Sequence, residues 1–384
     1  MSPQALWQKY RSLAAGAIAL ALVMGIGRFV YTPILPLMEV EGLSTTAGGA
    51  LASANYAGYM IGALAAVRLK KSSLRLLLLL LANVLFTWSM AYTDSLFWMH
   101  LLRFLSGLSS GLAFVLVSAL ILAAWRPRPN GMLYAGILFG GVGAGIFLSG
   151  ALTPLFQDAD SAWVGFGIVS LLLLAVAAAA YRHEEVPEVG DPGVVLRASG
   201  PHRKKHAAAY FFEGFGYIIF ATYIVSMLVS MDDLPIDPAY VWAAVGLGVM
   251  PSCVFWAVVA RRRGTLAALR MAYVLQLTGM LLPVLNQSVA VLLFSAICFG
   301  GTFMGITMLT MTYAPITGQR AIGVLTGGYG LGQLLGPLAA AWVIVRTEPL
   351  MALVLGAAAL AAALVLIQNM IREERRGTHA IREY

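Results

Sequence analysis

Three charged side chains lie inside long apolar stretches of this 384-residue chain: Arg28, Arg103 and Glu213. A charge at the centre of a bilayer costs about 2.5–3.5 kcal/mol on insertion scales, so such residues usually face a bundle interior or a watery cavity. A guanidinium group presents a fixed fork of donors that suits a carboxylate, phosphate or sulfonate, and a carboxyl group can bind and release a proton. The three residues therefore predict an anion-binding cavity formed by Arg28 and Arg103, with Glu213 as the proton-linked switch.

A structural role is the alternative for the same three residues. Arg28 and Glu213 would then form an ion pair that holds two parts of the protein together. Arg103 would cap backbone carbonyl groups.

Polar and aromatic neighbours extend the candidate substrate site. Tyr31 follows Arg28 by three residues and therefore shares its helix face. Asn55 and Tyr59 are four residues apart in the next apolar stretch, and an internal repeat described below aligns Tyr217 with Arg28. Each of these four residues is also a candidate for ordinary packing.

The elements that must position these residues are transmembrane helices. Hydrophobic residues make up 60% of the chain and charged residues 11%, whereas a soluble domain averages about 45–50% apolar and about 25% charged residues. This composition excludes a soluble globular protein, a disordered chain and a disulfide scaffold. A transmembrane helix needs about 20 mostly apolar residues. Hydropathy predicts twelve of them, near 12–37, 48–67, 73–92, 96–124, 131–155, 162–181, 207–230, 238–260, 265–285, 288–313, 320–345 and 349–370.

The joint at 182–206 differs from the others because it is charged and broken by proline and glycine, as an exposed linker is. It predicts three parts. They are an N-terminal six-helix bundle (1–181), a cytoplasmic linker (182–206), and a C-terminal six-helix bundle with a cytoplasmic tail (207–384).

Charge is distributed unequally between the two sides of these spans. With the N-terminus in the cytoplasm, every Lys and Arg except Arg28, Arg103 and Arg346 falls in a cytoplasmic joint or tail. The outer joints carry acids instead: Glu39, Glu41, Asp94, Asp158, Asp160, Asp232, Asp233, Asp237 and Glu348. Because positive charge is retained on the cytoplasmic side during insertion, both termini are predicted to be cytoplasmic. The net charge of +8 is then a topology signal, and no nucleic-acid partner is expected.

The two halves of the chain repeat a glycine pattern. Residues 136–150 read GILFGGVGAGIFLSG and residues 323–337 read GVLTGGYGLGQLLGP, which matches several glycines at one offset. Residues 25–31, GIGRFVY, match residues 214–220, GFGYIIF, and align Arg28 with Tyr217. Both halves begin on the same side, so the repeat is parallel.

The chain resembles the major facilitator superfamily, whose two six-span halves are parallel repeats. Arg103-Phe-Leu-Ser-Gly107 is similar to the family's fourth-helix pattern, and the stretch from Gly62 to Lys71 is similar to a degraded loop between spans 2 and 3. The segment GIGRFVYTPILPLM from Gly25, with EGFGY from Glu213, resembles most specifically the YbfB/YjiJ-type bacterial branch. The resemblance implies that spans 1, 4, 7 and 10 line a central cavity. It also implies that Arg103 takes part in proton coupling.

These observations predict a secondary active transporter in the cell (inner) membrane that moves a small solute, an organic anion, by proton-coupled alternating access. No catalytic constellation and no Walker lysine motif occurs, so neither an enzyme nor an ATP-driven pump is expected. A receptor that binds without flux, and Na⁺ in place of H⁺, stay open. We expect a monomer with no cofactor and no bound metal.

Two other substrate classes are kept as alternatives. The predicted cavity spans are otherwise apolar and aromatic, which makes a proton-linked exporter of hydrophobic, drug-like compounds the runner-up. Met227 and Met231, and likewise Met304, Met308 and Met311, recur at helical spacing. Thioethers suit Cu(I), so Cu(I) transport is the remote alternative, whereas Met also commonly fills gaps between packed helices.

Overall fold

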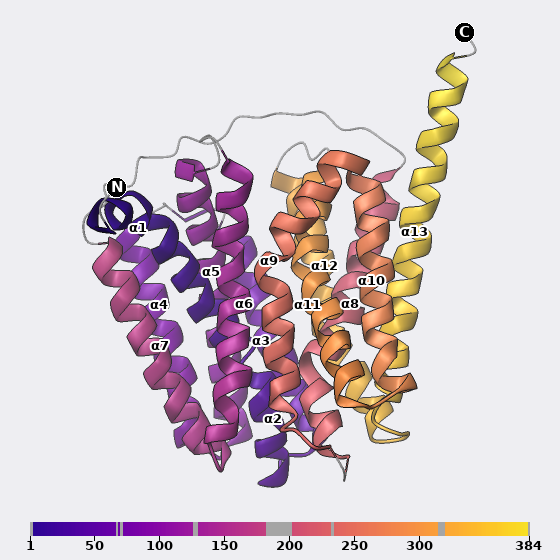
Figure 1. Ribbon diagram of the computed structural model, residues 1–384. Helices are drawn as coiled ribbons and strands as arrows, with labels where there is room; N and C mark the ends of the chain where they lie inside the picture. The colour runs from indigo at the N-terminus through magenta and orange to yellow at the C-terminus, as the bar shows by residue number, and fades with distance from the viewer. Residues whose placement is uncertain are drawn as a thin grey trace.

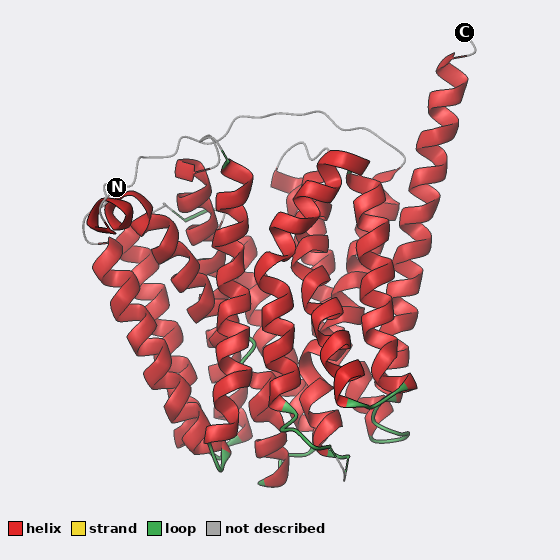
Figure 2. Cartoon of the chain, viewed as in Figure 1, coloured by secondary structure: helices red, strands yellow, loops and turns green. Residues whose placement is uncertain are grey.

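A computed structural model describes residues 3–66, 68–69, 72–125, 130–181, 202–231, 234–313 and 319–382. This part of the chain is a bundle of helices without strands (Figures 1 and 2). The long helices are α3 (Thr45–Ala66), α4 (Ser73–Ser89), α5 (Leu96–Trp125), α6 (Gly131–Leu152), α7 (Ala159–Tyr181), α8 (His202–Val229), α9 (Ala239–Arg263), α10 (Thr265–Leu285), α11 (Val289–Tyr313), α12 (Gln319–Ile344) and α13 (Met351–Arg382). The first span consists of α1 (Pro3–Leu20), the π-helix η1 (Ala21–Ile26) and α2 (Tyr31–Val40).

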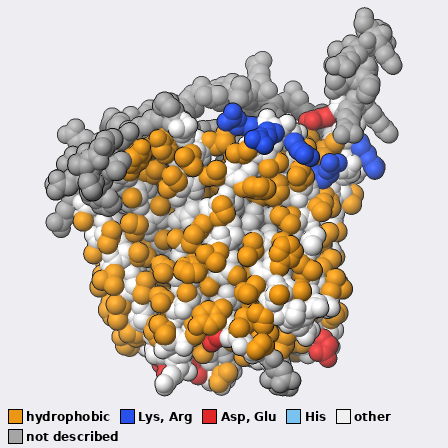
Figure 3. Space-filling model, viewed as in Figure 1, with side chains coloured by type: hydrophobic (Ala, Val, Ile, Leu, Met, Phe, Trp, Pro, Cys, Tyr) orange, Lys and Arg blue, Asp and Glu red, His pale blue; other side chains and the backbone are white. Residues whose placement is uncertain are grey.

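An apolar band covers the face of the bundle that Figure 3 shows. Lys and Arg side chains gather at the end of the bundle where α9 ends and α10 begins, which we call the basic end. Asp and Glu gather at the opposite, acidic end, where α2 ends and α3 begins. Among the described residues, ten segments are long and apolar enough to cross a bilayer. Length and hydropathy thus support ten of the twelve predicted spans. The exceptions are α3 and α12, which pack against each other.

Two sets of helices, α1 to α7 and α8 to α13, meet at a seam formed by α6 with α9, α3 with α12, and α2 with α8. The repeated glycines bring helix backbones together, some within each set and others across the seam, where Gly143 of α6 approaches α9. A Cβ atom at Gly145 of α6 would overlap the carbonyl oxygen of Ala21 in the first span. At the matching position of α12, a Cβ atom at Gly332 would overlap the carbonyl oxygen of Phe211 in α8. Small residues permit this approach of membrane helices.

The first span departs from the repeat, because α8 is continuous whereas its counterpart is interrupted. The backbone passes from α1 into the π-helix η1 and then into turns at 27–30 before α2 begins. Ser106 and Ser110 of α5 donate to carbonyl oxygens in this region, at 2.9 Å to Gly27 and 2.7 Å to Val23. Such π segments are frequent at functional sites, and Arg28 lies in the turn that follows.

Most helix bounds agree with the predicted spans, and three differ. α1 begins at Pro3, well before residue 12. α8 begins at His202, inside the predicted linker, and α13 continues to Arg382, well past residue 370. The helical extension of α13 leaves the bundle at the basic end (Figure 1). Its last residues are charged and polar, which shows that the helix extends beyond the apolar segment. Residues 182–201 of the predicted linker lie outside the described residues.

The two ends of the seam differ. Towards the acidic end, hydrogen bonds join the two sets of helices. Thr32 donates to the carbonyl oxygen of Ala221, Ser226 donates to the Glu39 carboxylate, and Tyr223 donates to the carbonyl oxygen of Thr45 at 3.4 Å. Towards the basic end, a cavity of about 670 Å³ lies between α5 and α6 on one side and α9 to α11 on the other. The seam is therefore closed by hydrogen bonds at the acidic end, beside a pocket of about 420 Å³, and it contains the larger cavity at the basic end.

Candidate functional site

Arg28 lies in an aromatic cage at the seam, with 2% of its surface exposed. Its guanidinium carbon is 4.1 Å from the ring centroid of Tyr59 and 4.9 Å from that of Tyr56, both on α3. Nη2 donates to the hydroxyl of Tyr217 on α8 at 3.4 Å. The Nε atom has no hydrogen-bond partner among the described residues. The structure thus brings together Arg28, Tyr59 and Tyr217, and it leaves one guanidinium N–H uncommitted.

Arg103 forms a second buried cluster on α5, with 1% of its surface exposed. Its guanidinium carbon lies 4.4 Å from the ring centroid of Tyr31, whose hydroxyl donates to the carbonyl oxygen of Gly48 at 2.8 Å. Asn55 donates to the Arg103 carbonyl oxygen at 3.0 Å. Within the described part of the chain, Nε and Nη2 of Arg103 have no hydrogen-bond partner. These two donors therefore do not cap backbone carbonyl groups there.

Glu213 is fully buried inside the second set of helices. Gln276 of α10 donates to its Oε1 atom at 3.0 Å, while Oε2 has no hydrogen-bond partner in the described regions. Glu213 lies one helical turn from Tyr217, the residue that contacts Arg28 across the seam. Among the residues that the structure describes, no ion pair joins Arg28 to Glu213. The alternative of an ion pair between the two halves is therefore not realised in this conformation.

Four polar residues at this site were not singled out from the sequence. Gln276 contacts Glu213, and Gln333 of α12 donates to the Tyr217 hydroxyl. Tyr56 completes the cage around Arg28 and shares a hydrogen bond with Thr222 of α8 at 3.2 Å. The fourth is Asn83. Amide side chains within apolar spans 3, 9 and 11 were a visible signal, but which residues they contact depends on the tertiary structure.

Asn83 of α4 holds the polar cluster behind the interrupted span. Its Nδ2 atom lies 2.9 Å from each of three acceptors: the carbonyl oxygen of Ser106 and the hydroxyl oxygens of Ser109 and Ser110. Ser106 and Ser110 in turn bind the carbonyl oxygens of the interrupted helix. One buried amide therefore supports the backbone that carries Arg28.

Replacing Asn83 with alanine is expected to lower the free energy of unfolding by about 1–3 kcal/mol, because buried acceptors would lose their donor. Thermal unfolding of the purified protein measures this change. Asn286→Ala, at an exposed asparagine at the acidic end, serves as the matched control and should have little effect. Equal melting temperatures for the two variants would contradict the supporting role of Asn83.

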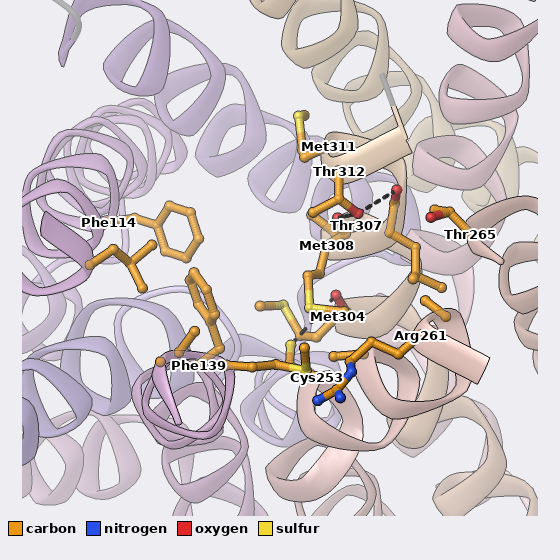
Figure 4. A pocket seen from close by; sticks show the side chains of 17 residues that line it. Phe114, Phe139, Cys253, Arg261, Thr265, Met304, Thr307, Met308, Met311 and Thr312 are labelled. Carbon is orange, nitrogen blue, oxygen red and sulfur yellow. Dashed lines mark hydrogen bonds between the residues drawn. The ribbon is translucent and has the colours of Figure 1, made fainter. Parts of the chain in front are cut away.

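The cavity at the basic end, which we call the basic-end cavity, has a largely apolar lining (Figure 4). Phe114 and Phe139 face it from the first half, and Met304 and Met308 face it from the second. Cys253 also lines it, and its thiol lies 3.8 Å from the carbonyl oxygen of Met304. Within the described residues, no group of three or more His, Cys, Asp or Glu side chains is placed to hold a metal ion. This cavity is the space through which a solute could approach the seam.

Helices in two sets, a seam closed at one end and buried charges beside it together define a membrane transporter of the major facilitator type. A family model described as an uncharacterised MFS-type transporter, YbfB, matches residues 20–368. The chain belongs to this family. It is therefore a transporter rather than an enzyme, embedded in a membrane by multiple spans.

A crystal structure of a mutant form of the nucleoside transporter NupG has the same fold, with a TM-score of 0.69. The two sequences are 13% identical, and the match covers 94% of this chain and 99% of that chain. At this identity the likeness concerns the fold alone. No curated protein matches the chain.

Proposed function

We propose that the chain moves a small organic anion by proton-coupled alternating access. One observation carries the proposal: Nε of Arg28, and Nε and Nη2 of Arg103, are buried donors without a hydrogen-bond partner among the described residues. A buried charge is costly unless it is paired. An anionic substrate would supply the missing countercharge and accept hydrogen bonds from these donors.

The asymmetry of the seam supports alternating access. The contacts of Thr32 with Ala221, of Ser226 with Glu39 and of Tyr223 with Thr45 would have to break for the acidic end to open. The two halves would then rotate about the Arg28–Tyr217 contact, because these two residues are equivalent in the two repeats. We place the basic end in the cytoplasm on the charge distribution, in the cell (inner) membrane, with the protein as a monomer.

Glu213 is the proposed proton site. Its partner is a neutral amide rather than a cation, so its charge changes the electrostatics of the second half when a proton binds. The change occurs one turn from Tyr217 and thus close to the Arg28 cage. Arg103 is the second coupling candidate because the resemblance to proton-linked transporters points to it and because it is a buried charge with unpartnered donors among the described residues.

A hydrophobic, drug-like substrate is the second candidate. The apolar lining of the basic-end cavity favours it, because residues such as Phe114, Phe139 and Met304 present no charged group to a ligand.

A ligand screen by thermal unfolding tests the proposal. Small carboxylates, phosphates and sulfonates are compared with lipophilic cations and Cu(I), on wild type, Arg28→Ala and the control Arg346→Ala, whose arginine is exposed at the acidic end. A ligand at a hundred times its Kd stabilises by about 2.7 kcal/mol. We expect an anion to stabilise wild type and Arg346→Ala but not Arg28→Ala. Stabilisation by cations or copper alone would refute the anion proposal.

A further inference from the structure

Two hydroxyl groups and the thiol in the wall of the basic-end cavity are already committed to the protein. The Thr307 hydroxyl donates to the carbonyl oxygen of Phe303 at 3.0 Å, and the Thr312 hydroxyl donates to that of Met308 at 3.0 Å. The Cys253 thiol lies against the carbonyl oxygen of Met304. Since these donors bind their own helices or a neighbouring one, the walls of the cavity offer a ligand mainly aromatic rings, thioethers and methyl groups. Such walls suit an apolar molecular surface.

The cavity leads towards the Arg28 cage. Phe114, which lines the cavity, packs against Tyr59 with ring centroids 6.2 Å apart. Tyr59 in turn contacts the Arg28 guanidinium, whose carbon lies 4.1 Å from the ring centroid. Tyr59 itself is only half-buried. The rings of Phe114 and Tyr59 therefore lie between an apolar cavity and a buried cation that keeps one N–H donor without a partner among the described residues.

Charge at the cavity mouth has the sign that suits an anion. Arg261, at the end of α9, is the one charged residue of its described lining, and its side chain is exposed at the rim (Figure 4). No carboxylate belongs to that described lining. An anion approaching from the basic end would meet an attractive field, whereas an organic cation would be repelled.

We propose that the substrate is an amphipathic anion, with its charged group held by Arg28 and Arg103 and its apolar body in the basic-end cavity. This inference rests on the proposed function, because it assigns the same two arginines to the anionic group. A volume of about 670 Å³ lies in the range of small-molecule sites, about 300–1,000 Å³. It exceeds what a small inorganic anion needs and leaves room for an alkyl or aryl group. The cavity walls come from both halves, so one ligand would contact both.

A chain-length series tests the inference on the full-length protein in lipid nanodiscs. Binding of acetate, butyrate, hexanoate and octanoate is measured by thermal shift and by competition with labelled octanoate, with octanol and octylamine as charge controls. We expect the affinity to rise about fourfold for each buried methylene group. Octanol and octylamine should bind far more weakly than octanoate.

Two variants locate the apolar body and the attractive charge. Met304→Gln places an amide in the cavity wall and is expected to weaken octanoate about tenfold, with acetate unchanged. Its control is Met351→Gln, at an exposed methionine of α13. Arg261→Gln should weaken octanoate about two- to fivefold, as expected for an exposed charge. Its control is Arg263→Gln, outside the cavity lining.

The outcomes separate this inference from the proposed function. Equal affinity for acetate and octanoate, or octanoate binding unchanged in Met304→Gln, would overturn the amphipathic substrate and leave the anion proposal standing. Octylamine or octanol binding as tightly as octanoate, or no saturable octanoate binding at all, would also overturn it. Carboxylate binding that persists undiminished in Arg28→Ala would instead reject the anion site itself.

Discussion

Arg103→Met is expected to make the substrate-free protein more stable and to impair transport. The side chain is 1% exposed, and two of its donors have no partner among the described residues. Replacing buried charge with apolar side chains of similar size is often stabilising, by about 1–4 kcal/mol. Methionine has similar length and can keep contact with the Tyr31 ring. We therefore expect a higher melting temperature for the variant without substrate.

Transport should change in the opposite direction. A hydrogen bond to a charged group contributes about 1.5–3 kcal/mol, so uptake at subsaturating substrate should fall about 10- to 100-fold. Proteoliposome flux and thermal unfolding, measured on the same preparation, give both quantities. Arg346→Met, at an exposed arginine of the acidic end, should change neither. A lower melting temperature together with normal flux would show that Arg103 supports the fold and does not bind substrate.

Higher stability together with lower transport in Arg103→Met would show that the charge of Arg103 serves transport at the expense of stability. Sites of this kind store unfavourable energy that a ligand relieves. Asn55, next to Arg103, also keeps a buried polar atom unsatisfied. Its Nδ2 atom donates to the Arg103 carbonyl oxygen, whereas its Oδ1 atom is buried without a partner in the described regions. Both residues were predicted as substrate contacts, and the structure places them side by side.

Most helix positions could be predicted from the sequence because a helix that crosses a bilayer needs a long apolar segment. The predicted spans 73–92, 96–124 and 131–155 match α4 with its terminal turn, α5, and α6 with its terminal turn to within a residue. The interruption of the first span could not be predicted in this way. Its apolar pattern is continuous, and the interruption is held by Ser106 and Ser110 from a helix far away in the chain.

The candidate site was predictable as a set of residues but not as a set of contacts. Burial of a charge in an apolar span indicates Arg28, Arg103 and Glu213 without any knowledge of packing. The pairing of Glu213 with Gln276 instead of Arg28 depends on how α8 packs against α10. The repeat alignment was more informative, because Arg28 and Tyr217 are equivalent positions and do meet at 3.4 Å.

Glu213→Gln is expected to uncouple transport from the proton gradient while leaving exchange intact. Glutamine has nearly the same shape and can still form a hydrogen bond with Gln276, so the packing between α8 and α10 is retained. It cannot bind and release a proton in the working pH range. With one proton per substrate, a gradient of one pH unit supports about tenfold accumulation. Wild-type proteoliposomes should reach a ratio of this order, whereas the variant should equilibrate its substrate without accumulation.

Counterflow of labelled substrate at equal pH distinguishes coupling from a defect in transport itself. The variant should exchange substrate at a rate similar to wild type, because neither the Arg28 cage nor the basic-end cavity contains Glu213. Glu348→Gln, at an exposed acid of the acidic end, is the control and should accumulate normally. Normal accumulation by Glu213→Gln would show that another residue couples transport to protons, and Arg103 would be the next candidate. Loss of counterflow would instead make the buried carboxylate part of substrate binding, since exchange at equal pH needs no net movement of protons.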